Sequence, residues 1–418
     1  MEDRYWCKGM EKENYSKKKL NVQFILICTL IILSIIDIYT KFLNSSFVSI
    51  SYIYILYPVF LYYFLVKKEA LKLNDWWELL FFAGGLIGIS CITNMLFHPI
   101  DFKYFIQVFN FLLFPFLGYS FAKYNPEQIR KKIYWLIVLI AFYANIVGIF
   151  QIVTGNLRNG NRTDSFMGHP IVYCTLLVTA YPLINLLFKS NLLRSIFKLF
   201  LIFGILSTQS RSGWIAWLVI IVCDYFFCVN NNKKVYSEKK IILMLFFMLM
   251  IICLLLIFHS EFCNMVNYYT NLISSRLDNT FEGIAATQRE GIFLNIISSM
   301  SPIEYIVGNG YYSSHSFVNT LGIIGTGSQT TDNEYLTLIY EEGIFGLAYA
   351  IWIIRICIKG LINKSKNQEL KNLSLSIMAA MVSACFYEMF SWTNISVIVL
   401  ILIGILYFEL KRIEATLL

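Results

Sequence analysis

Long apolar runs separated by short polar segments cover most of the chain. Runs of about 20 apolar residues recur, and a helix of that length crosses the hydrocarbon core of a bilayer. The pattern predicts an all-α integral membrane protein with about 12 transmembrane helices. The predicted helices span residues 20–40, 47–66, 77–97, 103–121, 133–153, 170–188, 196–208, 213–229, 241–259, 335–358, 374–392 and 394–410.

One polar stretch, between the ninth and tenth predicted helices, is much longer than the others. We expect residues 260–334 to form a large extracytoplasmic loop. Within it, residues 289–300 place apolar side chains on one helical stripe and predict a short amphipathic helix that ends before Pro302. The predicted organisation is a cytoplasmic N-terminal tail (1–19), transmembrane helices 1–9 (20–259), this loop (260–334), transmembrane helices 10–12 (335–410) and a cytoplasmic tail (411–418).

The basic residues set the predicted sidedness. Most of the 34 Lys and Arg lie in short runs that fall on alternate connections between apolar segments, as cytoplasmic topology signals do. Both termini are therefore predicted to be cytoplasmic, and the connections after the fifth and ninth helices to face outward. Because the net charge of +8 is distributed in this way, no nucleic-acid partner is expected.

The amino-acid composition gives no indication of a cofactor. The chain is 57% hydrophobic and 14% charged, and several of its ten cysteines lie inside apolar segments, where they behave as small hydrophobes. No Cys-x-x-Cys pair or His/Cys cluster has metal-ligand spacing, so we predict no metal and no cofactor. The first long apolar run is too long for a cleaved signal peptide.

Arginines dominate the basic residues left on the predicted outer side. A guanidinium binds phosphate oxygens bidentately and stays charged, so these residues are candidates to hold a diphosphate, although salt bridges to nearby acids are the alternative. Arg211 stands out because it lies in a polar turn that interrupts an apolar run, where lipid exposure costs about 2.5 to 3.5 kcal/mol. The outward arginines are Arg158, Arg162, Arg211, Arg276 and Arg289.

The segment from 289 to 346 concentrates the remaining polar residues. Gly308 and Gly310 allow the backbone to approach a ligand closely. Asp332 and Gly343 are 11 residues apart, so we expect them on one face of the tenth helix, with Gly343 and Gly346 permitting close helix packing. Glu341 and Glu342 would lie deep in that helix, and at least one is expected to pair with an arginine or line a cavity.

Two other residues receive no functional role from the sequence. His315 lies among serines and is expected to be solvated, with only a minor claim to be an alternative base. Glu388 has no motif around it.

Four of these motifs, in this order, resemble the O-antigen ligase and O-antigen polymerase superfamily of bacterial membrane proteins. They are Arg162 before Gly168-His169-Pro170, Ser210-Arg211-Ser212, Arg289 leading to Pro302 and Gly308-Asn309-Gly310, and Asn333-x9-Gly343-x-x-Gly346. The resemblance covers roughly residues 155–350.

The resemblance implies a metal-independent glycosyltransferase of the bacterial cytoplasmic (inner) membrane, with an extracytoplasmic active site that uses a polyprenyl-diphosphate-linked glycan. Carried over, it makes Arg211 and Arg289 the phosphate-binding arginines, with Arg162 as a third candidate. Together with Asp332, whose role follows from the expected mechanism below, Arg211 and Arg289 are the catalytic candidates. The substrate-binding candidates are Arg162, Asn333, Gly308, Gly310 and Glu341. Membrane lipids surround the protein, and a flippase and a chain-length regulator are candidate partners.

The last motif departs from the ligase pattern, which generally has His-Asn where this chain has Asp332-Asn333. That difference favours a polymerase that joins lipid-linked repeat units of an O-antigen or capsule-like polysaccharide. In the expected mechanism the arginines stabilise the leaving diphosphate, Asp332 takes the proton of the attacking hydroxyl or orients it, and in-line displacement inverts the anomeric configuration.

Two alternatives stay open. The first is ligase-type transfer of the glycan to another acceptor, such as a protein or a teichoic-type polymer. The second is a transporter of lipid-linked oligosaccharides without covalent chemistry, which 12 helices would suit equally well. Against a transporter, the two halves show no internal repeat, and the unusual arginines lie near predicted outer helix ends rather than within helices.

Overall fold

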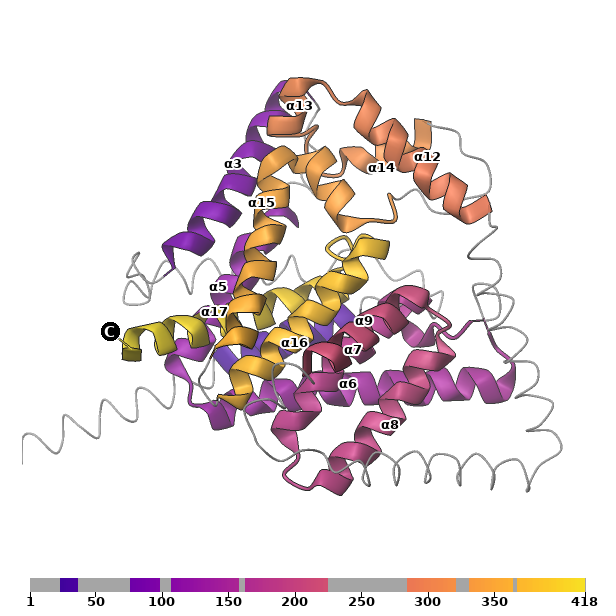
Figure 1. Cartoon of the computed structure of the whole chain (residues 1–418), viewed down its shortest axis with the longest axis vertical. Coiled ribbons are helices and arrows are strands. Elements are labelled where there is room, and N and C mark those ends of the chain that lie inside the picture. Colours follow the sequence, from indigo (N-terminus) through magenta and orange to yellow (C-terminus); the bar gives the residue numbers. More distant parts are fainter. Residues whose placement is uncertain are drawn as a thin grey trace, which may run out of the picture. The chain divides into compact units, whose positions relative to one another are not determined.

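The described part of the protein is helical. The computed structural model describes residues 23–36, 76–97, 107–157, 162–224, 284–320, 331–363 and 367–417, and these contain helices and no strand (Figure 1). The predicted all-α class is therefore confirmed. Among the described residues, four helical stretches are long and apolar enough to cross a membrane: Glu127–Thr154, Pro170–Leu187, Glu334–Ile362 and Thr393–Ala415.

The chain divides into two compact units. The first comprises residues 1–220 and 299–418, and the second residues 221–298. The described helix of the second unit is α12 (Ile284–Ser299), which covers most of the predicted amphipathic segment 289–300. It ends before Pro302, as expected.

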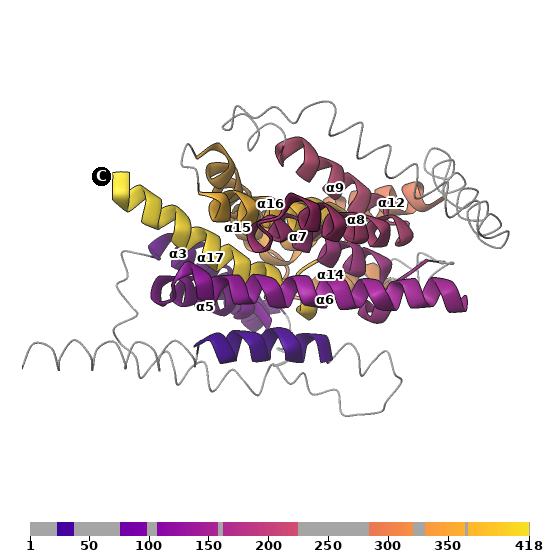
Figure 2. The ribbon, with the colours of Figure 1, turned by 90° about the horizontal axis from the view of Figure 1, so that it is seen from below.

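The first unit holds the remaining described helices. They are α3 (Trp77–Phe97), α5 (Asn110–Tyr124), α6 (Glu127–Thr154), α7 (Pro170–Leu187), α8 (Asn191–Ser207), α9 (Arg211–Cys223, crossing the boundary at residue 220), α13 (Pro302–Val307), α14 (Ser313–Thr320), α15 (Glu334–Ile362), α16 (Gln368–Ser383) and α17 (Thr393–Leu417). A helix over Gln23–Ile36 precedes them. α17 packs along α5, and α16 lies between α7 and α15 (Figures 1 and 2).

Local sequence explains where several of these helices begin and end. α6 ends at Gly155, whose positive φ of 66° lets its N–H reach back to two carbonyls of the last turn. α7 begins at Pro170, as predicted, with His169 as N-cap. α13 begins with Pro302 behind a capping box formed by Ser301 and Glu304.

The predicted helix boundaries hold for some elements and not for others. Residues 77–97 form α3 with the predicted limits. The predicted helix 374–392 is wrong, because α16 stops at Ser383 and a short 3-10 turn, Ala384–Phe386, leads into a non-helical segment before α17. The predicted helices 47–66 and 241–259 lie outside the described residues.

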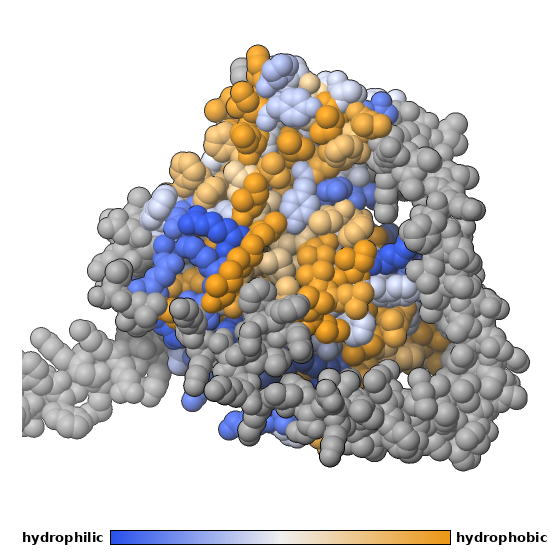
Figure 3. All heavy atoms as spheres, viewed as in Figure 1, coloured by the Kyte–Doolittle hydropathy of each residue, from blue (hydrophilic) through white to orange (hydrophobic). Residues whose placement is uncertain are grey.

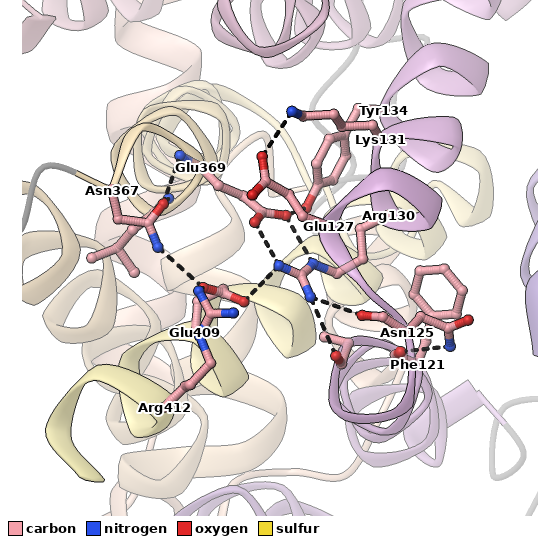
Figure 4. Close-up of polar contacts among 12 residues, drawn as sticks. Phe121, Asn125, Glu127, Arg130, Lys131, Tyr134, Asn367, Glu369, Glu409 and Arg412 are labelled. Atoms are coloured by element: carbon pink, nitrogen blue, oxygen red, sulfur yellow. Dashed lines mark hydrogen bonds and ion pairs between the residues drawn. The ribbon is translucent and has the colours of Figure 1, made fainter. Parts of the chain in front are cut away.

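A buried ionic cluster joins the end of the bundle where α6 and α16 begin (Figure 4). Arg130, 2% exposed, donates from Nε and Nη2 to the two carboxylate oxygens of Glu369 at 2.9 and 2.6 Å. Its Nη2 also lies 2.8 Å from Glu409 of α17. The cluster thus joins α6, α16 and α17.

The outer surface of the first unit is apolar over several helices. Figure 3 shows hydrophobic side chains gathered over α3, α13 and α15. Phe81, Ile303 and Ile351, which belong to these helices, are 60%, 67% and 55% exposed. Such a surface suits contact with lipid acyl chains rather than water. The described helices therefore support an integral membrane protein.

Candidate functional site

The tenth predicted helix is broken where the glycine-rich segment meets it. Gly343 has φ 60° and ψ −147° in the middle of α15, so the helix kinks there. The freed carbonyls of Tyr340 and Glu341 accept from the N–H groups of Asn309 and Gly310, both at 2.8 Å. The α13–α14 connection thus docks onto the kink by backbone hydrogen bonds.

Gly308 makes this docking possible. Its φ is +72°, and a Cβ there would overlap the backbone of Glu341 and Glu342. A Cβ on Gly343 would likewise overlap the carbonyl of Ile306. The close packing predicted for Gly343 is confirmed, and the structure places Gly308 and Gly310, predicted to bind substrate, against α15.

The two consecutive glutamates of α15 are buried and bonded to serines. Glu341 accepts from Ser314 Oγ at 2.5 Å, and Glu342 accepts from Ser90 Oγ of α3. Among the residues that the structure describes, their side-chain donors are these serines rather than the predicted arginine. Glu341, a predicted substrate-binding residue, is 4% exposed and connects α14 to α15.

The start of α15 is held by the segment between α16 and α17. Glu388 in that segment accepts from the Thr331 N–H at 2.6 Å, and Glu334 accepts from the Phe390 N–H at 2.8 Å. Both glutamates are 2% exposed. The Phe390 N–H is thus bonded to Glu334 rather than to a carbonyl one helical turn earlier, which is consistent with the helix stopping before residue 392.

His315 of α14 completes this group. Its Nε2 lies 2.9 Å from Glu388 Oε2, and the Tyr312 ring stacks on the imidazole at 4.1 Å between centroids. Burial alone would raise the pKa of Glu388, but its contacts with His315 and Thr331 hold that pKa below the ordinary value. The carboxylate therefore stays ionised beside the imidazole.

The predicted arginine turn forms as expected. α8 ends at Ser207, Gln209 takes a positive φ of 50°, and α9 begins at Arg211, which is partly exposed. Arg162 donates from Nε to the Thr208 carbonyl at 3.0 Å. The structure thus brings Arg162 to the turn that carries Arg211.

The arginine turn and the His315–Glu388 pair belong to one connected end of the first unit. The short 3-10 turn Ser165–Met167 follows Arg162, and Met167 Sδ accepts from Asn394 Nδ2 at 3.6 Å. The His169 ring lies 5.9 Å from that of Trp392, at the end of the segment that holds Glu388. Residues 384–392 therefore link the elements that carry the two groups.

Asp332 and Asn333 lie at the start of α15 rather than within it. Asp332 has a positive φ of 54°, and Asn333 is the N-cap, accepting from the N–H groups of Tyr335 and Leu336. The prediction that Asp332 and Gly343 share a helical face is wrong, because the helix begins after Asp332 and kinks at Gly343. The side chain of Asn333 serves as a cap in this structure.

The structure describes the side chains of some of the predicted arginines and not of others. Arg289 lies on α12 in the second unit, and its side chain is outside what is described. Arg158 and Arg276 also fall outside the described residues. The described residues contain no group of three His, Cys, Asp or Glu side chains arranged to hold a metal.

His315 and Glu388 are the residues that sequence reasoning missed. The signal was a lone carboxylate, Glu388, inside a stretch predicted to be a membrane helix, where an ionisable side chain marks a functional candidate. The pairing itself joins residues 73 positions apart through a turn between two helices, as only the fold reveals.

Comparisons with known proteins agree with the predicted resemblance. Residues 196–351 match the family model described as O-antigen ligase, a range that runs from α8 to the kinked part of α15. The chain is also 29% identical over 167 residues to the ComP-specific O-oligosaccharyltransferase of Acinetobacter baylyi, an alignment that covers 37% of this chain and 30% of that protein. The resemblance to the O-antigen ligase superfamily is thereby confirmed for this region, and the chain matches less than a third of its relative's length.

Proposed function

We propose, on the premise that residues 196–351 carry an O-antigen ligase domain, that the protein is a membrane glycosyltransferase. It transfers an oligosaccharide from a polyprenyl diphosphate to an acceptor hydroxyl at the outer face of the bacterial cytoplasmic membrane. The observation that carries the proposal is the connected end of the first unit, where an arginine turn and an imidazole–carboxylate pair are linked through residues 384–392. Leaving-group stabilisation and proton transfer both need such groups.

The arginines stabilise the leaving group, which is the diphosphate of the lipid carrier. Breaking the bond between the anomeric carbon and the diphosphate leaves negative charge on the phosphate oxygens, and fixed guanidinium groups stabilise that charge most in a water-poor site. Arg211 opens α9 in a turn anchored by Arg162, so both lie near one helix N-terminus, which itself favours anions. Arg289 is a third candidate on sequence grounds. Direct in-line attack by the acceptor, without a metal, inverts the configuration.

The first acceptor that we propose is another lipid-linked repeat unit, which makes the protein a polysaccharide polymerase. Support comes from the last motif, where Asp332 stands in place of the histidine typical of ligases. The second acceptor is a protein hydroxyl. It is favoured by the printed name of the relative, an O-oligosaccharyltransferase specific for ComP.

An in vitro transfer assay tests the proposal and separates the acceptors. The purified protein in nanodiscs is given lipid-linked oligosaccharide extracted from its native membranes, without added metal, and the products are resolved by gel and mass spectrometry. A ladder of longer lipid-linked glycans supports the polymerase. Glycan on an added pilin-like protein, without a ladder, supports the second acceptor. Donor that stays intact with both acceptors contradicts the proposed function.

A further inference from the structure

The contact between His315 and Glu388 joins elements that are far apart in the sequence. His315 lies on α14, in the predicted outer loop, and Glu388 in the connection between α16 and α17. Nε2 lies 2.9 Å from Oε2, so the carboxylate faces that ring nitrogen and stabilises a positive charge on the imidazole.

Three features fix the imidazole while leaving it reachable. The Glu388 side chain is 1% exposed and is held from a second side by the Thr331 N–H at 2.6 Å. Tyr312 stacks on the ring with an interplanar angle of 18°. The His315 side chain is 13% exposed, so it is not sealed in the core. A base held in one orientation beside an accessible surface suits proton transfer.

Glu388 of this pair also contacts the segment that contains Asp332. Glu388 binds the backbone of Thr331, the residue directly before Asp332. Ligase-type sequences generally carry a histidine at the position of Asp332, and here an imidazole approaches the same stretch from a different helix. An imidazole is a better proton acceptor near neutral pH than an aspartate of ordinary pKa.

We propose that His315 is the proton acceptor of the transfer reaction and that Glu388 positions it, an assignment that rests on the proposed function. The acceptor oxygen forms a bond to the anomeric carbon as the bond from that carbon to the diphosphate oxygen breaks. The bonding electron pair leaves with the diphosphate, and the hydroxyl proton passes to the His315 imidazole. Asp332 then orients the acceptor or the loop rather than taking the proton.

Steady-state kinetics of three variants test this assignment in the nanodisc assay. His315→Gln should lower kcat by about 100-fold or more, the usual contribution of a general base, with the donor KM nearly unchanged. Asp332→Asn should lower kcat by less than about tenfold, since it removes no general base. Glu414→Gln, in an exposed ion pair with Lys359, is the matched control for Glu388→Gln and should behave as the unsubstituted protein.

The pH profile separates positioning from a merely structural role. The titratable groups around the imidazole are Glu388 on Nε2, Tyr312 on its face and Glu341 of α15, which interacts with it electrostatically. Activity should fall at low pH as His315 becomes protonated. Removing the carboxylate in Glu388→Gln destabilises the imidazolium, so this acid limb should move to lower pH by about 1 unit.

Three results would each overturn a different part of the proposal. A His315→Gln variant with near-normal kcat, together with a large loss in Asp332→Asn, overturns the assignment and leaves the proposed function intact. A Glu388→Gln variant that loses activity without any movement of the acid limb assigns that residue a structural role and overturns its positioning role. No transfer by the unsubstituted protein removes the proposed function and this assignment with it.

Discussion

At the scale of single residues, the backbone around the kink of α15 is shaped by glycines that have no substitute. Gly308 combines a positive φ with direct contact to the α15 backbone, so two separate penalties apply to any side chain there. Gly155 at the end of α6 also has a positive φ, +66°, but a Cβ there meets nothing within 4 Å. Gly155 therefore serves as a reference glycine that has a positive φ but makes no close contact.

We expect Gly308→Ala to destabilise the protein more than Gly155→Ala. A non-glycine residue at the left-handed angles of Gly155 (φ 66°, ψ 12°) costs about 1 to 2 kcal/mol, whereas the angles of Gly308 (φ 72°, ψ −179°) lie in a region that is essentially restricted to glycine. Gly308→Ala adds overlap with Glu341 and Glu342, which must push α13 from the kink. Thermal unfolding in detergent should give a clearly lower Tm for Gly308→Ala. Equal shifts in Tm for the two variants would contradict the tight docking described for Gly308.

At the scale of elements, the ionic cluster of Arg130 joins α6, α16 and α17. Arg130 is engaged by two carboxylates and by the Asn125 carbonyl at 2.9 Å, while Tyr134 donates to Glu369 at 2.6 Å. Arg412 donates to Glu409 at 2.5 Å. A buried pair is weak support for overall stability, but breaking it leaves a charge uncompensated.

Replacing Glu369 by Gln should therefore lower the free energy of unfolding by about 3 to 5 kcal/mol. The control is again Glu414→Gln, whose partner Lys359 is 44% exposed and whose loss should cost at most about 1 kcal/mol. Unfolding in mixed SDS and detergent micelles measures both values. Similar small losses in both variants would mean that the cluster does not hold the three helices together.

The sequence predicted the elements whose signals are local. An apolar run of full length gave α3 its limits, and Pro170 marked the start of α7. It did not predict the break after Ser383, because the segment that follows is bonded to residues more than 50 positions away, Glu388 to Thr331 and Phe390 to Glu334. The kink at Gly343 depends in the same way on the α13–α14 segment that binds the freed carbonyls.

The candidate site was likewise predictable only where its signals are local in the sequence. The polar turn at Arg211 was readable from sequence, and the structure brings Arg162 to that turn. The His315–Glu388 pair was not, since neither residue has a local motif and their contact is made through tertiary structure. Asp332 was placed on a helical face that does not exist, because spacing alone cannot show where Asn333 caps the helix.

At the scale of the first unit, polar groups are divided between two ends of an otherwise apolar bundle. Several helices run between them: α6 and α16 begin near Arg130, whereas α15 and α17 begin near the arginine turn and the His315–Glu388 pair. In the ionic cluster Arg130 is engaged by Glu369 and Glu409, while the other group carries arginines, an imidazole and positive-φ residues. An enzyme that acts at one face of a membrane requires its reactive groups to be gathered in this way, and a transporter can have the same arrangement.

Release of polyprenyl diphosphate is the measurement that separates these two functions most directly. The protein in nanodiscs receives its lipid-linked donor and acceptor, and free polyprenyl diphosphate is quantified alongside transferred glycan for the unsubstituted protein and for Arg211→Lys. We predict equal amounts of both products from the unsubstituted protein and at least about a 100-fold slower release in Arg211→Lys, because lysine keeps the charge but loses the bidentate fork. Donor that remains uncleaved, with its glycan still joined to the lipid, would contradict glycosyl transfer as the activity of this protein.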